Sequence, residues 1–155
     1  MRSRKRRLYW DSCNFISLIS EDEVNRADIC QHILEDAERG AAEIVTSALT
    51  IAEVIKPKGS PIFTAEKEQK ISEFFLHEYI LIYDVTREIA ESARKLSRQH
   101  GLKPRDAIHL ATALKAEEVE VFQTWDISDF ADLDVPIRIE VPKWTGTLRM
   151  PLDGV

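Results

Sequence analysis

The stretch Leu8-Tyr9-Trp10-Asp11-Ser12-Cys13-Asn14-Phe15-Ile16 joins a short apolar strand to the beginning of a helix. Residues 6–10 are predicted to form the first strand, which ends at a single carboxylate, Asp11. From residue 14 to residue 20 the apolar side chains recur at helical spacing. A carboxylate at such a junction is either a helix cap or part of a polar site, and the rest of the chain decides between these two interpretations.

Length and composition predict one globular domain. The chain has 155 residues, of which 44% are hydrophobic and 31% are charged. No apolar run approaches the roughly 18–20 residues of a membrane-spanning helix. The basic start imitates a signal peptide, but Asp11 and Asn14 interrupt the apolar run and no small-residue cleavage site follows. With Cys13 and Cys30 in no metal-binding spacing, we expect a cytoplasmic protein without membrane contact.

Charge is unevenly distributed along the chain. The formal net charge is −6, yet five of residues 2–7 are basic. We treat residues 1–6 as a basic N-terminal extension, residues 7–144 as a single domain and residues 145–155 as a C-terminal tail. The extension is either a solvated tail or an arm that faces RNA, because a local basic patch attracts phosphate in spite of the global charge.

Strands and helices alternate along the whole chain. Further strands are predicted at 43–48, 79–85, 119–123 and 136–141, and the run 79–85 is apolar enough to be buried on both sheet faces. Helices are predicted at 14–20, 21–39, 50–55, 64–77, 86–99 and 104–118, with a short helical turn near 129–133. This order predicts an α/β fold with a parallel sheet between two layers of helices, and ligands beyond the carboxyl ends of the strands.

Four acidic residues lie where such a fold would place a site. Asp11, Glu53 and Asp126 follow predicted strands, so their side chains are expected at one edge of the sheet. Asp106 follows a turn between two helices, and its convergence with the others does not follow from this argument. If the four carboxylates meet, they must protonate or hold cations, and oxygen ligands favour Mg²⁺ or Mn²⁺.

Each acid also has a structural interpretation. Asp11 would cap a helix, Asp126 would cap the turn that contains Asp129, and Thr50-x-x-Glu53 matches a capping box. With Pro104 as the first helical residue, Asp106 would be favoured by the helix dipole.

Four motifs resemble those of PIN-domain ribonucleases, most closely the VapC-type toxins of toxin–antitoxin pairs. They are residues 9–16 (YWDSCNFI), 46–54 (TSALTIAEV), 105–113 (RDAIHLATA) and 124–130 (TWDISDF), and residues 141–144 (VPKW) resemble the end of such toxins. The resemblance implies a PIN-like three-layer α/β/α fold with a central parallel sheet of about five strands. It also implies that Asp106 reaches the shared pocket.

The resemblance assigns roles to individual residues. Asp11, Glu53, Asp106 and Asp126 would be the catalytic, metal-binding acids, and Asp129 competes with Asp126 for the fourth position. Supporting roles would fall to Ser12, Asn14 and Thr124. We interpret His109 as a packing residue rather than a general base, and Trp125 as a core or rim aromatic rather than a base-stacking one.

The resemblance implies an Mg²⁺- or Mn²⁺-dependent endoribonuclease that cleaves phosphodiesters with an activated water. Expected partners are an RNA substrate, a cognate antitoxin and a second copy of the chain, with residues 22–39 and 64–77 as candidate contact helices. tRNA, rRNA and mRNA all fit these residues. The alternative is a catalytically silent PIN fold that binds RNA or protein. A phosphoryl-accepting receiver domain fits poorly, because Asp11 has no acidic neighbour.

Overall fold

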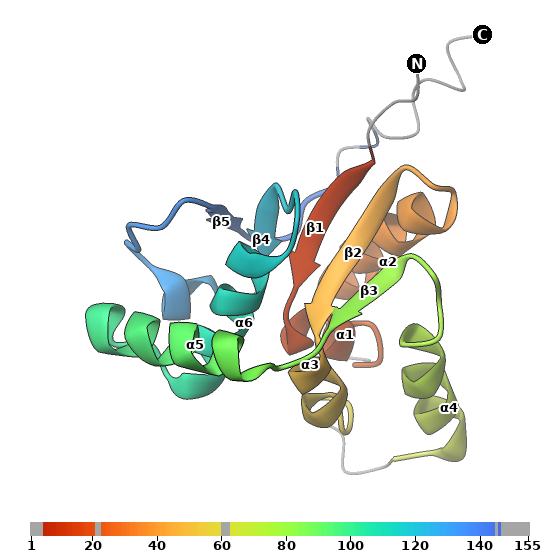
Figure 1. Ribbon diagram of the computed structural model, residues 1–155. Coiled ribbons are helices and arrows are strands. Elements are labelled where there is room, and N and C mark those ends of the chain that lie inside the picture. The colour runs from red at the N-terminus through yellow and green to blue at the C-terminus, as the bar shows by residue number, and fades with distance from the viewer. Residues whose placement is uncertain (1–4, 21–22, 60–62, 145, 147–155) are drawn as a thin grey trace, which may run out of the picture.

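The described part of the chain contains one sheet of five parallel strands in the order β3-β2-β1-β4-β5 (Figure 1). The computed structural model describes residues 5–20, 23–59, 63–144 and 146; most of the expected basic extension and C-terminal tail lies outside this part. The strands are β1 (Arg6–Trp10), β2 (Ala42–Ser47), β3 (Ile80–Tyr83), β4 (Val121–Gln123) and β5 (Arg138–Glu140). The helices are α1 (Ser12–Ser17), α2 (Val24–Glu38), α3 (Ala48–Glu53), α4 (Ala65–Phe74), α5 (Arg87–His100), α6 (Pro104–Lys115) and the 3₁₀ turn η1 (Ile127–Phe130).

The central strand is β1, and its side chains alternate between the two faces of the sheet. Leu8 and Trp10 belong to one core and Tyr9, between them, belongs to the other. All three are almost fully buried. A strand that is covered on both faces is apolar at every position, which explains the apolar run before Asp11.

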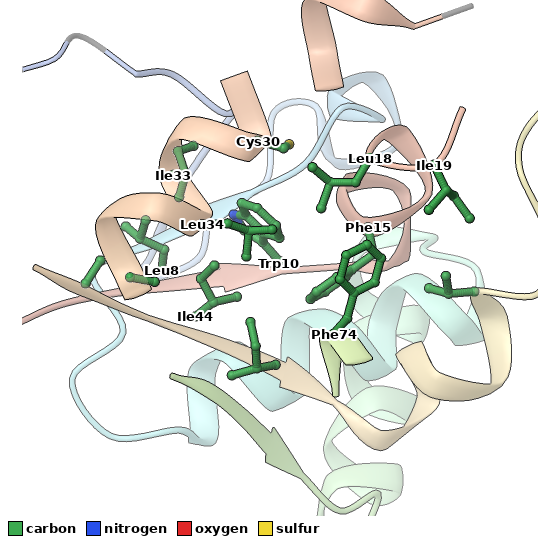
Figure 2. Close-up of a cluster of buried hydrophobic side chains, with 14 of the residues drawn as sticks. Leu8, Trp10, Phe15, Leu18, Ile19, Cys30, Ile33, Leu34, Ile44 and Phe74 are labelled. Atoms are coloured by element: carbon green, nitrogen blue, oxygen red, sulfur yellow. The ribbon is translucent and has the colours of Figure 1, made fainter. Parts of the chain in front are cut away.

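Helices cover both faces of the sheet, and each layer encloses its own core. Side chains of α1, α2 and α4 pack on Leu8, Trp10 and Ile44, and Figure 2 shows this cluster around Trp10 and Phe15. On the other face α5 and α6 pack on Tyr9, Val45 and Phe122, on the side where Figure 1 places these two helices. The predicted α/β/α architecture with a five-stranded parallel sheet is therefore confirmed.

Several element boundaries differ from the prediction. The run 79–85 contains only the four residues of β3, an edge strand that is half-buried after Ile80, because nothing pairs with it beyond β2 within the described residues. The capping box at Thr50 is wrong: Ser47 caps α3 through its hydroxyl, which accepts from the Leu49 amide. Glu53 is instead the last residue of α3.

The remaining helices begin or end within a few residues of their predicted positions. Thr64 and Thr86 cap α4 and α5 with their hydroxyls, and Gly101 ends α5 in a left-handed conformation. In the described ranges, every helix is too short or too polar to cross a membrane.

Candidate active site

A cavity of about 450 Å³ lies beyond the carboxyl ends of β1, β2 and β4, and all four predicted acids line it: Asp11, Glu53, Asp106 and Asp126. Its lining also includes Ser12, Cys13 and His109, and the basic residues Arg26, Lys56, Lys58 and Arg105. The cavity is therefore acidic and basic at once. Segments from five separate parts of the chain contribute to it.

Asp11 is held by the elements on either side of it. The Thr124 hydroxyl, directly after β4, donates to Oδ2 at 2.8 Å, and the Cys13 thiol donates to Oδ1 at 2.7 Å. Asp11 occupies the N-cap position of α1, but its side chain makes no capping hydrogen bond. The interpretation of Asp11 as a helix cap is therefore wrong for the side chain, which turns into the cavity.

Burial dominates the ionisation of Asp11. Its side chain is 5% exposed, and loss of solvation raises its pKa to about 6, against the lowering effects of His109, Cys13 and Thr124. The nearby charge of Asp126 raises the pKa further. A carboxylate in this environment is stabilised by a cation, because a cation compensates both the lost solvation and the repulsion.

Glu53 contacts His109, which the sequence analysis assigned to packing. His109 lies on the buried face of α6 with 2% exposure, and its Nε2 is 2.6 Å from Glu53 Oε1. Its other ring nitrogen, Nδ1, is 2.7 Å from the hydroxyl of Tyr9. His109 is buried as expected, but it also lines the cavity and contacts a predicted metal ligand.

Asp106 lies in the first turn of α6, two residues after Pro104, and lines the cavity. Burial raises the pKa of Asp106, and the charge of Asp129 adds to this effect. Asp106 can therefore both interact favourably with the dipole of α6 and belong to the site, since the first turn of α6 faces the cavity. Burial and repulsion again favour a cation beside the carboxylate.

Asp126 and Asp129 occupy different positions. Asp126 lines the cavity, and its amide donates to the Thr124 hydroxyl at 3.0 Å. Asp126 stands at the N-cap of η1, but its side chain makes no capping bond. Both residues are exposed, but Asp129 is absent from the cavity lining, and its charge raises the pKa of Asp106. The geometry thus favours Asp126 as the fourth acid.

The expected supporting residues have different surroundings. Asn14 is fully buried, and its amide donates to the Gln123 carbonyl at 3.0 Å, so it fastens α1 to β4 rather than contacting an acid. Ser12 lines the cavity. Trp125 packs against the core, donates from Nε1 to Ser17 and lies 5.1 Å below the Arg26 guanidinium, so it is the predicted rim aromatic.

The donors in the cavity fit a hard divalent cation in kind. Carboxylate oxygens prefer Mg²⁺ or Mn²⁺, whereas the softer donors Cys13 and His109 are already engaged in hydrogen bonds. Within the described residues, no three acidic, histidine or cysteine side chains lie close enough together to form a metal site. Carboxylates that repel one another are expected to stand apart until a cation draws them together.

Comparisons with known proteins support the fold. A family model described as PIN domain matches residues 8–135. The structure is similar to a toxin–antitoxin complex from Klebsiella pneumoniae, with 24% identity, a TM-score of 0.57, and coverage of 85% of this chain and 99% of that one. It is also similar to VapC20 from Mycobacterium tuberculosis, a sarcin–ricin loop cleaving toxin, with 14% identity, a TM-score of 0.56, and coverage of 83% and 98%. A search of curated proteins gave no match.

Proposed function

This chain belongs to the PIN domain family, and on that premise we propose that it is a metal-dependent endoribonuclease and the toxin of a toxin–antitoxin pair. The observation that carries the proposal is the meeting of Asp11, Glu53, Asp106 and Asp126 at one cavity. Burial raises the pKa of Asp11 and of Asp106, and carboxylates in such surroundings concentrate at functional sites.

The four carboxylates would hold Mg²⁺ or Mn²⁺. When bound, the cation supplies a water of lowered pKa and neutralises the charge that develops on the phosphodiester. The protein's part is to orient the ligands: Thr124 and Cys13 fix both oxygens of Asp11, and His109 fixes Glu53. No protein nucleophile is required.

Basic residues in the same cavity suit an RNA substrate. Arg26, Lys56, Lys58 and Arg105 line the cavity beside the acids. Their charges would bind the phosphates that flank the scissile bond and offset the repulsion between the acids and the RNA backbone. This local arrangement allows RNA binding in a chain whose net charge is −6.

An antitoxin, a second copy of the chain and a cytoplasmic location belong to the same proposal. The similar structure from Klebsiella pneumoniae is a toxin–antitoxin complex. A groove between α2 and α4 is a candidate antitoxin site, and it is lined by Leu18, Ile19, Ser20, Val24, Ala27, Asp28, Lys67 and Lys70. Val24 is 62% exposed there, and the apolar face of an amphipathic segment would match the apolar floor of this groove.

The proposal is tested by sequencing RNA cleavage ends after induction of the wild type, Asp11→Asn and Asp84→Asn in cells. Asp84 also follows a strand, β3, but it is exposed and is absent from the cavity lining, so it is a matched control. We expect Asp11→Asn to lose at least about 100-fold in cleavage and Asp84→Asn to behave as the wild type. Purified enzyme should lose activity in EDTA and regain it with Mg²⁺ or Mn²⁺.

Two results would contradict the proposal. If folded Asp11→Asn still cleaves, the site is elsewhere. RNA binding without metal-dependent cleavage by the wild type would identify the silent binding module instead.

A further inference from the structure

Glu53 receives little support from its own backbone. It is the last residue of α3, a helix of six residues, and the chain leaves helical geometry at the next residue, Val54. Ile51 and Ile55, on either side of it, are 47% and 67% exposed. A carboxylate at the end of a short, half-exposed helix is not held in one direction by its own backbone, so its direction depends on what its side chain contacts.

Within the described residues, the hydrogen bond of the Glu53 carboxylate is made to His109 Nε2, at 2.6 Å. The two residues are 56 positions apart and come from α3 and α6, so the contact joins a marginal element to a well-packed one. His109 stands on the most buried stretch of α6, between Ala107 and Leu110, which have no exposed surface. The imidazole therefore provides a fixed point that α3 lacks.

Tyr9 fixes the ring of His109 in turn. The Tyr9 hydroxyl is 2.7 Å from Nδ1, and the two rings meet edge to face with centroids 5.9 Å apart. Tyr9 belongs to the central strand, has no exposed surface and stacks on Phe122 at 5.0 Å. Three buried groups thus form a chain from the middle of the sheet to the cavity: the Tyr9 hydroxyl, the His109 imidazole and the Glu53 carboxylate.

The direction of these hydrogen bonds follows from the donors available. The Thr46 and Thr112 hydroxyls near Tyr9 donate to backbone carbonyls of Trp10 and Ile108. The Tyr9 hydroxyl, 2.7 Å from Nδ1, can therefore donate to that nitrogen. The tautomer of His109 that carries its proton on Nε2 would accept from Tyr9 and donate to Glu53.

We infer that Tyr9 and His109 are positioning residues that hold the Glu53 carboxylate in the direction required of a metal ligand. The inference rests on the proposed function, in which Glu53 binds Mg²⁺ or Mn²⁺. Both nitrogens of His109 lie within hydrogen-bond distance of protein groups, so the ring is placed to orient Glu53. Partners of this kind orient ligating carboxylates and typically change metal affinity about 10–100-fold when removed.

Two isosteric substitutions separate positioning from packing. In His109→Gln the side-chain amide nitrogen can occupy the place of Nε2, so the donor to Glu53 is retained. In His109→Asn the side chain reaches only the place of Nδ1, so the contact with Tyr9 is retained and the contact with Glu53 is lost. Leu110→Ala, on the same buried helix, is the control for lost packing alone.

The measurement is Mn²⁺ affinity of the folded, full-length protein by calorimetry and electron paramagnetic resonance, alongside RNA cleavage. We expect His109→Asn to weaken Mn²⁺ binding about 10–100-fold and His109→Gln to recover at least about a third of wild-type affinity. Leu110→Ala should lower the melting temperature and leave the Mn²⁺ affinity of the folded protein unchanged. Long-range ¹H–¹⁵N spectra of the wild type should show the His109 proton on Nε2, with a weaker preference in Tyr9→Phe.

Three results would overturn the inference while leaving the proposed function intact. One is equal Mn²⁺ affinity in His109→Asn and wild type, and another is an equal loss in His109→Asn and His109→Gln. The third is a wild-type His109 with its proton on Nδ1. Failure of the proposed function has a different signature, since the wild type itself would then neither bind Mn²⁺ nor cleave RNA.

Discussion

Asp11 and Glu53 reach the same cavity from opposite kinds of support. Asp11 follows the central strand, is 5% exposed, and receives hydrogen bonds from Thr124 and Cys13. Glu53 ends a six-residue helix, and the support that it receives within the described chain comes through His109. One cavity thus combines a carboxylate fixed by the sheet with another fixed by a single distant side chain.

The stability of the protein in metal-free buffer should depend on the ionisation of Asp11. The pKa of Asp11 is raised from 3.8 to about 6, so the folded state disfavours its charged form. The penalty is absent below about pH 4, grows as pH rises to about 6, and stays constant above, at about 3 kcal/mol. Asp11→Asn should abolish this loss of stability, as measured by urea unfolding at pH 4 and pH 7 in EDTA.

Asp84→Asn is the control for the removal of any carboxylate, and it should keep the wild-type dependence on pH. Added Mn²⁺ should restore stability to the wild type at pH 7 and do little for Asp11→Asn. If the free energy of unfolding changes equally in the wild type and Asp11→Asn between pH 4 and pH 7, burial of the Asp11 carboxylate does not destabilise the protein.

The choice between the acids of η1 provides the next largest effect. Asp126 lines the cavity and Asp129 does not. We expect Asp126→Asn to reduce RNA cleavage about 10–100-fold. Asp129 affects the site through the pKa of Asp106, so we expect Asp129→Asn to reduce cleavage about threefold. Initial rates of cleavage of one RNA oligonucleotide across Mn²⁺ concentrations measure both. The reverse order of effects would assign the fourth ligand to Asp129.

The contribution of Thr124 measures how firmly the sheet holds Asp11. Its hydroxyl donates to Asp11 and accepts from the Asp126 amide. A hydrogen bond to a charged group contributes about 1.5–3 kcal/mol, so Thr124→Val should lower cleavage by roughly 10-fold or more. Thr124→Ser keeps the hydroxyl and should retain most activity. A larger loss in Thr124→Ser than in Thr124→Val would mean that the methyl group, not the hydrogen bond, is what matters.

Cys13 should have the smallest effect. Its thiol lies 2.7 Å from Asp11, but a thiol is a weak donor. We expect Cys13→Ala to lower cleavage about two- to threefold, and Cys13→Ser to match or exceed the wild type because a hydroxyl is the stronger donor. A larger loss in Cys13→Ala than in Thr124→Val would reverse the assignment of which donor holds Asp11.

The sequence predicts the strand-end acids because their placement follows from the topology of parallel sheets alone. Asp11 comes directly after β1 and Asp126 lies three residues after the end of β4, and because these strands are adjacent and parallel, both acids lie at one edge. The prediction that Asp106 reaches the cavity depended on the family resemblance, because the direction of the first turn of α6 is set by the packing of this helix on the sheet. The apolar run 79–85 predicted a strand buried on both faces, whereas β3 is a half-buried edge strand. Apolar character does not reveal whether a strand has one neighbour or two.

His109 shows where prediction from sequence ends. Its neighbours along the chain, Ile108 and Leu110, are apolar, and a single histidine among them is most simply assigned to the core. Its two partners are 100 and 56 positions away, so the contacts exist only after the sheet and α6 have packed. The contact of Tyr9 with His109 could not be predicted either, since an aromatic residue in an apolar strand predicts only burial.

The position of β1 in the middle of the sheet also orders events during synthesis. One neighbour of β1, β2, is made soon after it, but the other, β4, begins at Val121, and Asp126 comes later still. A nascent chain that has released its first hundred residues holds Asp11 and Glu53 but lacks Asp106, His109 and Thr124. At about 5–20 residues per second the ribosome takes several seconds to add them. The cavity therefore cannot assemble until most of the chain has left the ribosome.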